Sequence, residues 1–144
     1  MRRGFTLVEL VVVILILAVL VAVAAPRVID AADDAAENSL KHSLERIRDA
    51  IAMYEAANGA LPGADGTAGT FKADLAPYFH NSLFPASPLG PTKGDRRVRM
   101  LNDGDPLQGN VNPNRAWKYD YTTGEFIFNW REVSKDGATK YSEF

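Results

Sequence analysis

The sequence contains no cysteine, and only two of its 144 residues are histidine. Without cysteine the chain forms no disulfide and no thiolate metal site, so an exported form depends for stability on its core, on assembly or on an oxygen-ligated ion. The net charge of −2 also lacks the basic excess that dedicated nucleic-acid-binding proteins usually carry. His42 and His80 belong to no grouping of serine, histidine and carboxylate, so no enzymatic activity is predicted.

One long apolar run dominates the N-terminal part of the chain. Within Phe5–Ala25 only Thr6 and Glu9 are polar, and Arg2 and Arg3 precede the run. A helix of about 20 residues reaches about 30 Å, which is the thickness of the hydrocarbon core of a bilayer. Because basic residues remain on the cytoplasmic side, we expect a single transmembrane pass with a cytoplasmic N-terminus and the following domain outside.

Three interpretations of this run stay open on the residues alone. It is a cleaved secretory signal with a small-residue site at Val23–Ala25, a plain membrane anchor, or a segment in which Glu9 has a partner. A carboxylate at membrane depth costs about 2.5–3.5 kcal/mol, so a partner for Glu9 is expected. Cleavage after Gly4 would create an α-amino group on Phe5, and the Glu9 carboxylate of a neighbouring copy would be placed to pair with it.

The residues Gly4–Glu9 (GFTLVE), after a short basic leader, resemble the N-terminal signal of type IV pilins and type II secretion pseudopilins. This resemblance implies cleavage between Gly4 and Phe5 by a prepilin peptidase, followed by N-methylation of Phe5. It covers residues 1–26 and includes Pro26, which matches the family's helix-weakening proline. Size, the absence of cysteine and the segment Asn58–Pro62 make the chain most similar to the major pseudopilin.

The resemblance implies a structural subunit that leaves the bacterial inner membrane and assembles with copies of itself into a periplasmic or extracellular filament. A type II secretion pseudopilin acting in protein export is the first interpretation. A type IV or competence pilin, acting in adhesion, motility or DNA uptake, is the alternative. The implied partners are the prepilin peptidase, an inner-membrane assembly platform and, before assembly, membrane lipid. A membrane-anchored binding or enzymatic domain is the alternative of a different class, and it would require a pocket with convergent polar groups.

The chain divides into four predicted segments: a leader peptide (1–4), a transmembrane and filament-core helix (5–26), an amphipathic helix (27–58), and a loop region with a C-terminal sheet (59–144). Pro26 lacks an N–H group, so a kink is expected there. After Pro26, apolar residues recur every three or four positions, as on one buried face of a helix: Ile29, Ala32, Ala36, Leu40, Leu44, Ile47, Ile51 and Tyr54. The predicted fold class is α+β and pilin-like, with a long N-terminal helix packed on a small antiparallel β-sheet.

Strand patterns occupy the C-terminal part of the chain. Arg96–Leu101 is a candidate first strand. Ala116–Tyr121 and Glu125–Trp130 form the clearest hairpin, because aromatic and β-branched residues flank a turn that contains glycine. We expect Ser134–Phe144 to be an edge strand or a fraying tail.

Two clusters in this part are candidate binding sites. Three side chains offer oxygen ligands at close spacing, namely Asn102, Asp103 and Asp105. Calcium favours such oxygens and is the one cofactor that the sequence suggests, with a simple turn as the preferred alternative. Three arginines form the basic cluster, namely Arg96, Arg97 and Arg99. A solvated strand is expected there in preference to a DNA-contacting patch, so DNA is not an expected partner.

Overall fold

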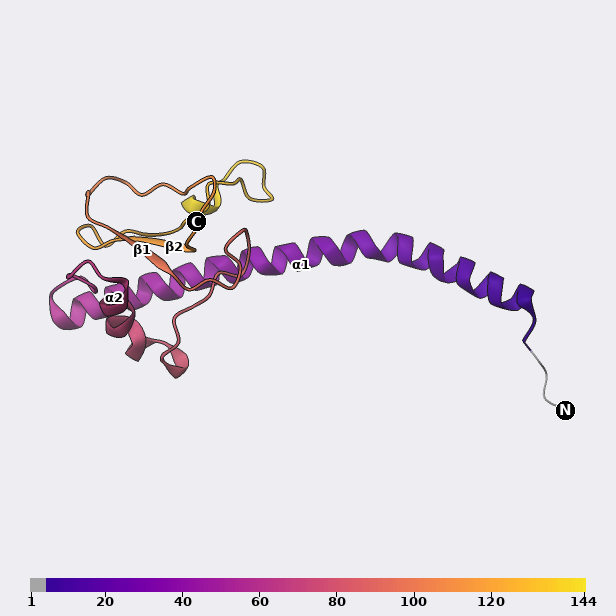
Figure 1. The fold of residues 1–144 in the computed structure, drawn as a ribbon, viewed down its shortest axis with the longest axis horizontal. Coiled ribbons are helices and arrows are strands. Elements are labelled where there is room, and N and C mark those ends of the chain that lie inside the picture. Colours follow the sequence, from indigo (N-terminus) through magenta and orange to yellow (C-terminus); the bar gives the residue numbers. More distant parts are fainter. Residues whose placement is uncertain (1–4) are drawn as a thin grey trace. The chain divides into compact units, whose positions relative to one another are not determined.

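The structure is a computed structural model that describes residues 5–144, apart from the side chains of residues 23–30. A long helix, α1 (Leu7–Asn58), is followed by a short helix, α2 (Ala68–Leu75) (Figure 1). Three strands follow, β1 (Val98–Leu101), β2 (Trp117–Asp120) and β3 (Phe126–Phe128), and 3-10 turns lie at Ala76–Tyr78, His80–Ser82 and Tyr141–Glu143. The chain divides into two compact units between Ala35 and Ala36, within α1.

The first unit consists of the N-terminal part of α1. The predicted long helix is confirmed, and its helical assignment continues through Pro26. The side chain of Pro26 lies outside the described residues, so the kink stays a prediction. Among the residues that the structure describes, no helix holds an apolar stretch long enough to cross a lipid bilayer.

The second unit is a globular domain whose core begins on the apolar face of α1. Leu40, Leu44 and Ile47 are at most 1% exposed, as the helical periodicity predicts. The same pattern placed Ala32 on the buried face, and there the prediction is wrong because Ala32 is exposed. The buried stripe therefore belongs to the part of α1 that the globular domain covers.

The sheet is mixed, with strand order β1-β2-β3. The predicted hairpin is confirmed, because β2 and β3 are antiparallel with Trp117 opposite Phe128. The prediction of an antiparallel sheet is wrong for the other pair, since β1 and β2 are parallel with Val98 opposite Trp117. A parallel pair needs a connection that returns the chain to the same end of the sheet, and residues 102–116 provide it.

The two faces of the sheet have different environments. One face contributes alternate residues to the core: Val98, Met100, Trp117, Tyr119, Phe126 and Phe128. Phe71 of α2 packs against this face, with its ring centroid 4.3 Å from that of Tyr119. The other face carries Arg99, Lys118 and Ile127 in one cross-strand row. Lys118 and Ile127 are nevertheless only 8% and 4% exposed, so this outer face is covered over β2 and β3, whereas Arg99 on β1 is exposed.

The segment after β3 is neither an edge strand nor a fraying tail, so that prediction is wrong. Trp130 and Tyr141 stack with ring centroids 5.1 Å apart and an interplanar angle of 2°. Arg48 of α1 donates a hydrogen bond from Nη1 to the main-chain oxygen of Phe144 at 2.6 Å. Aromatic packing and this hydrogen bond attach a mostly polar segment to the core, which polarity alone does not predict.

Candidate assembly site

At the start of α1, Thr6 and Glu9 bind each other reciprocally. Glu9 Oε2 accepts hydrogen bonds from the Thr6 backbone N–H at 2.9 Å and from Thr6 Oγ1 at 2.8 Å. In return, the Glu9 backbone N–H donates to Thr6 Oγ1 at 3.2 Å. This arrangement is a capping box, in which the first and fourth residues of a helix start satisfy each other's backbone donors. Sequence reasoning missed it, although a threonine three residues before a glutamate at an apolar run is its known signal.

The capping box leaves part of the Glu9 carboxylate available. All of the bonds to Thr6 use Oε2 as the acceptor atom of Glu9, and a carboxylate offers about four acceptor positions. Phe5, which would bear the new α-amino group, is 77% exposed. Pairing of Glu9 with a neighbour's Phe5 amine is compatible with this geometry and stays a prediction. Gly4, on the other side of the predicted cleavage site, lies outside the described residues.

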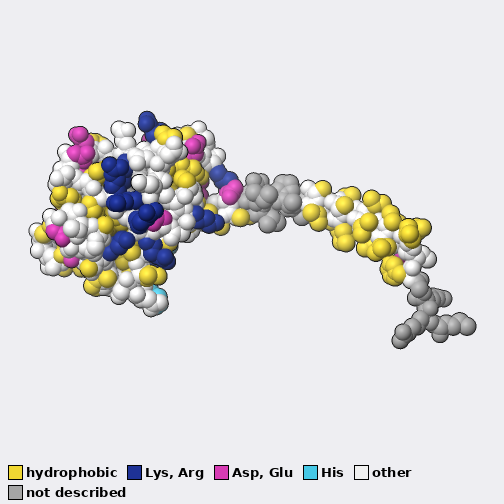
Figure 2. All heavy atoms as spheres, in the orientation of Figure 1, with side chains coloured by type: hydrophobic (Ala, Val, Ile, Leu, Met, Phe, Trp, Pro, Cys, Tyr) yellow, Lys and Arg dark blue, Asp and Glu magenta, His cyan; other side chains and the backbone are white. Residues whose placement is uncertain are grey.

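Apolar side chains cover the N-terminal part of α1 (Figure 2). The large apolar residues from Leu7 to Val21 are between 40% and 78% exposed. Soluble monomers rarely expose contiguous apolar patches of more than a few hundred Å² without a binding role. This surface therefore requires lipid or other protein surfaces to cover it.

Two of the three predicted calcium ligands, but not Asn102, line an open hollow of about 580 Å³. Asp103 and Asp105 line it, together with the cationic residues Arg99, Lys118 and Arg131. In the described part of the chain, no three side chains of the His, Cys, Asp or Glu type lie close enough together to hold a metal ion. A calcium site at Asn102, Asp103 and Asp105 accordingly stays a prediction.

A buried carboxylate that sequence reasoning did not single out organises the turns next to this hollow. Asp120 is 0% exposed. Its Oδ1 accepts from the N–H and Oγ1 of Thr122 at 2.7 Å and 2.6 Å, and its Oδ2 accepts from the Gly104 N–H at 3.0 Å. Burial by itself raises the pKa of Asp120, but these hydrogen bonds outweigh burial and lower the pKa. Asp120 thus joins the turn at residues 102–105 to the turn between β2 and β3.

Replacing Asp120 with asparagine is expected to lower the free energy of unfolding by about 2 kcal/mol at pH 7, because an amide NH₂ would face the Gly104 N–H. The lowered pKa means that the wild-type carboxylate stabilises the fold above the unfolded-state value of about 3.9. This stabilisation is lost as the pH falls through the folded-state pKa. Urea unfolding should therefore show a smaller difference between Asp120→Asn and wild type at pH 3 than at pH 7.

Asp103→Asn is the matched control for this experiment, since it removes the same charge from an exposed neighbour. We expect it to change the unfolding free energy by less than about 0.5 kcal/mol. Equal losses from the two variants at pH 7 would contradict the structural role of Asp120.

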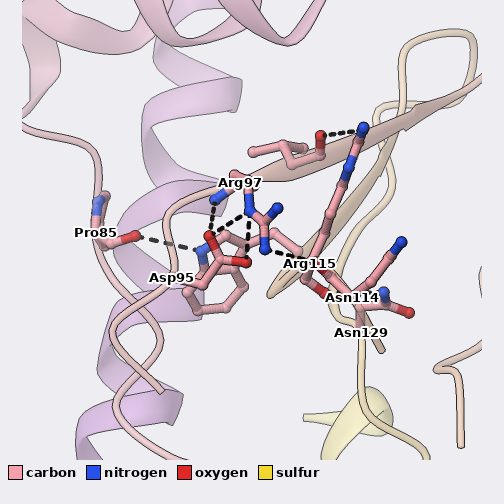
Figure 3. A network of polar contacts seen from close by, with 8 residues as sticks. Pro85, Asp95, Arg97, Asn114, Arg115 and Asn129 are labelled. Atoms are coloured by element: carbon pink, nitrogen blue, oxygen red, sulfur yellow. Dashed lines mark hydrogen bonds and ion pairs between the residues drawn. The ribbon is translucent and has the colours of Figure 1, made fainter. Parts of the chain in front are cut away.

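The three arginines of the predicted basic cluster have different surroundings. Arg97 pairs with Asp95, with Nε 3.0 Å from Oδ1, and its Nη2 donates to the main-chain oxygen of Asn114 at 2.8 Å (Figure 3). Arg96 donates from Nε to the main-chain oxygen of Phe84 at 2.9 Å. Of these three arginines, only Arg99 lines the hollow next to Asp103 and Asp105. Hydrogen bonds to the protein thus engage Arg96 and Arg97, while Arg99 makes none with a described residue.

Comparison with known proteins supports the N-terminal resemblance. Residues 1–25 match the family described as the prokaryotic N-terminal methylation motif. The chain is 36% identical over 63 residues to the type IV narrow pilus major component PilA5 of Thermus thermophilus, covering 44% of this chain and 54% of that protein. It is 39% identical over 61 residues to the type II secretion system core protein G of Pseudomonas aeruginosa, covering 42% and 43%.

The predicted resemblance to pilins and pseudopilins is confirmed by these matches. The chain spans about half the length of the curated relatives that it matches. No solved structure matches it.

Proposed function

We propose that this chain is a structural subunit of a pilus-like filament, and that it acts as a pseudopilin of a type II secretion system. The observation that carries the proposal is the exposed apolar surface from Leu7 to Val21, which follows a methylation-type N-terminus. A surface of this kind gains stability whenever it is removed from water or packed against its like. Stacking of identical helices would cover this apolar surface in every subunit through the same helix–helix contact.

The proposed pathway has three steps. The chain is first held in the bacterial inner membrane by residues 5–26, with its N-terminus in the cytoplasm. A prepilin peptidase then cleaves after Gly4, and Phe5 becomes N-methylated. At an assembly platform, the subunit finally leaves the lipid and joins the filament, where its Glu9 meets the Phe5 amine of a neighbouring copy. Lipid and sister helices thus cover the same apolar surface in turn.

A pilus subunit is the second candidate, because the chain is as similar to a pilus component as to a secretion component. Deletion of the gene in its host separates the two: loss of secreted proteins supports the pseudopilin, and loss of surface pili supports the pilin. The names of both relatives describe components of assemblies, which favours a structural role over an enzymatic one.

Maturation provides the direct test. We expect co-expression with a prepilin peptidase to remove residues 1–4 and to add one methyl group, as measured by intact mass. Gly4→Val should block cleavage, because glycine lets the backbone approach a catalytic site more closely than any other residue. Ala18→Val, which enlarges a residue within α1, is the matched control and should be processed normally. A mature N-terminus close to Ala25 would contradict the proposal and favour an ordinary secretory signal.

A further inference from the structure

The hollow on the outer face of the sheet is built from residues far apart in the sequence. Arg99 of β1 and Lys118 of β2 are cross-strand partners on that face, and Arg131 follows β3. The segment at residues 105–112 forms the opposite wall. The Arg131 N–H holds this wall in place by donating to the main-chain oxygen of Asn110 at 3.0 Å. A volume of about 580 Å³ is within the range of small-molecule sites.

Each cationic group of this hollow has N–H donors that make no hydrogen bond to a described residue. Lys118 donates from Nζ to the main-chain oxygen of Gln108 and to Oδ1 of Asn110, the latter at 2.9 Å, which leaves one of its three donors. Neither guanidinium, of Arg99 or of Arg131, is hydrogen-bonded to a described residue. Within the described part of the chain, none of the three cations forms an ion pair. All three cationic residues line the same open hollow.

The electrostatics of the hollow favour an anion. Burial lowers the pKa of Lys118, and the nearby charge of Arg99 lowers it further, while Asp103 acts in the opposite direction. Burial and Arg99 thus make the charged form of Lys118 less favourable. An anion beside Lys118 would stabilise this charged form, because it supplies an opposite charge next to the buried ammonium. With three cations and two carboxylates, the hollow has an excess of one positive charge.

The two carboxylates define the rest of the ligand. Asp103 and Asp105 are exposed residues of the lining, and they accept hydrogen bonds but repel further negative charge. They therefore disfavour polyanions and favour a ligand with hydroxyl donors. The amides of Gln108, Asn110 and Asn112 offer both donors and acceptors to such hydroxyls.

We propose that this hollow is a binding site for a small ligand with one carboxylate and several hydroxyl groups, of the chemical class of the hexuronic acids. The carboxylate lies among Arg99, Lys118 and Arg131, and the hydroxyl groups face Asp103, Asp105 and the amide side chains. All residues of this site belong to the globular domain, and none lies on the apolar part of α1 from Leu7 to Val21.

The test is a titration of the full chain, in a non-ionic detergent, with sodium glucuronate. Backbone amide signals of Gly109, Asn110 and Lys118 in nitrogen-15 NMR spectra report on the hollow. We expect saturable shifts with a dissociation constant on the order of 1 mM, as is usual for a small polar ligand. Glucose lacks the carboxylate and acetate lacks the hydroxyl groups, so each should bind at least about tenfold more weakly.

Arg99→Gln and Arg131→Gln should each weaken glucuronate binding at least about tenfold, since each removes charged donors. Both side chains are exposed and without hydrogen bonds to described residues, so the fold should survive. Lys93→Gln removes the same charge from an exposed position outside the hollow and should bind normally. The proposal is overturned if glucuronate gives no saturable shifts, or if glucose or acetate binds as tightly as glucuronate. It is also overturned if Lys93→Gln weakens binding equally, or if calcium shifts the same amides and glucuronate does not.

Discussion

Glu9→Gln is expected to abolish filaments while leaving folding, membrane insertion and cleavage after Gly4 intact. Glutamine at this position still closes a capping box with Thr6, so the start of α1 keeps its hydrogen bonds. It removes only the negative charge that would meet a neighbour's Phe5 ammonium. Leaving one charge of a buried pair uncompensated costs about 3–5 kcal/mol, which lowers the subunit association constant by at least about a hundredfold.

The measurement is the yield of sheared filaments beside the abundance of the subunit in the membrane fraction. Thr6→Ser keeps the capping hydroxyl next to an unchanged Glu9 and is the matched control, with a filament yield close to that of the wild type. Wild-type filament yield from Glu9→Gln would show that Glu9 serves the helix start alone. Glu9→Leu removes both capping and charge, so a defect confined to that variant would have the same meaning.

Gly63→Ala is expected to lower the free energy of unfolding by about 3–4 kcal/mol, which is a large share of the stability of a small domain. A Cβ at this position would lie 2.8 Å from Phe71 Cβ and 3.0 Å from Phe71 Cα, and Phe71 is a fully buried residue of the core. The φ of +68° adds the penalty that non-glycine residues meet in the left-handed region. Overpacking of a core typically adds about 1–3 kcal/mol to that penalty.

Gly59→Ala separates these two contributions. Gly59 also has a φ of +68°, at the end of α1, but nothing lies within 4 Å of an added Cβ. Its substitution should therefore cost only the backbone penalty of about 1–2 kcal/mol. Urea unfolding, followed by the fluorescence of Trp117 and Trp130, gives both values. Equal losses in the two variants would contradict the tight contact between Gly63 and Phe71.

The parts of the fold that were predictable are those specified by near neighbours in the sequence. The stripe from Leu40 to Ile51 repeats with helical spacing, and the hairpin of β2 and β3 surrounds a short turn with glycine. The parallel pairing of β1 was not predictable in this way, because it depends on where residues 102–116 return. Local patterns specify that Val98–Leu101 is extended, and they say nothing about the strand that it joins.

The candidate sites show the same limit. The capping partner of Glu9 was predictable, since Thr6 lies only three residues before it in the sequence. The hollow was not predictable from the sequence. Arg99 and Lys118 become neighbours only through the register of a parallel pair, and each separately resembles an ordinary solvated charge. Asp120 is likewise recognisable only when the Gly104 turn is seen beside it.

The parallel pairing of β1 and β2 also has a consequence for the order of folding. The hairpin of β2 and β3 closes through a few residues, whereas β1 reaches β2 only after residues 102–116 have closed into a loop. Loop-closure entropy grows with loop length, so we expect β1 to dock after the hairpin has formed. Until then, one edge of β2 presents unpaired N–H and C=O groups that a second unfinished chain can bind. We therefore expect strand exchange between copies that are still folding to compete with completion of each fold.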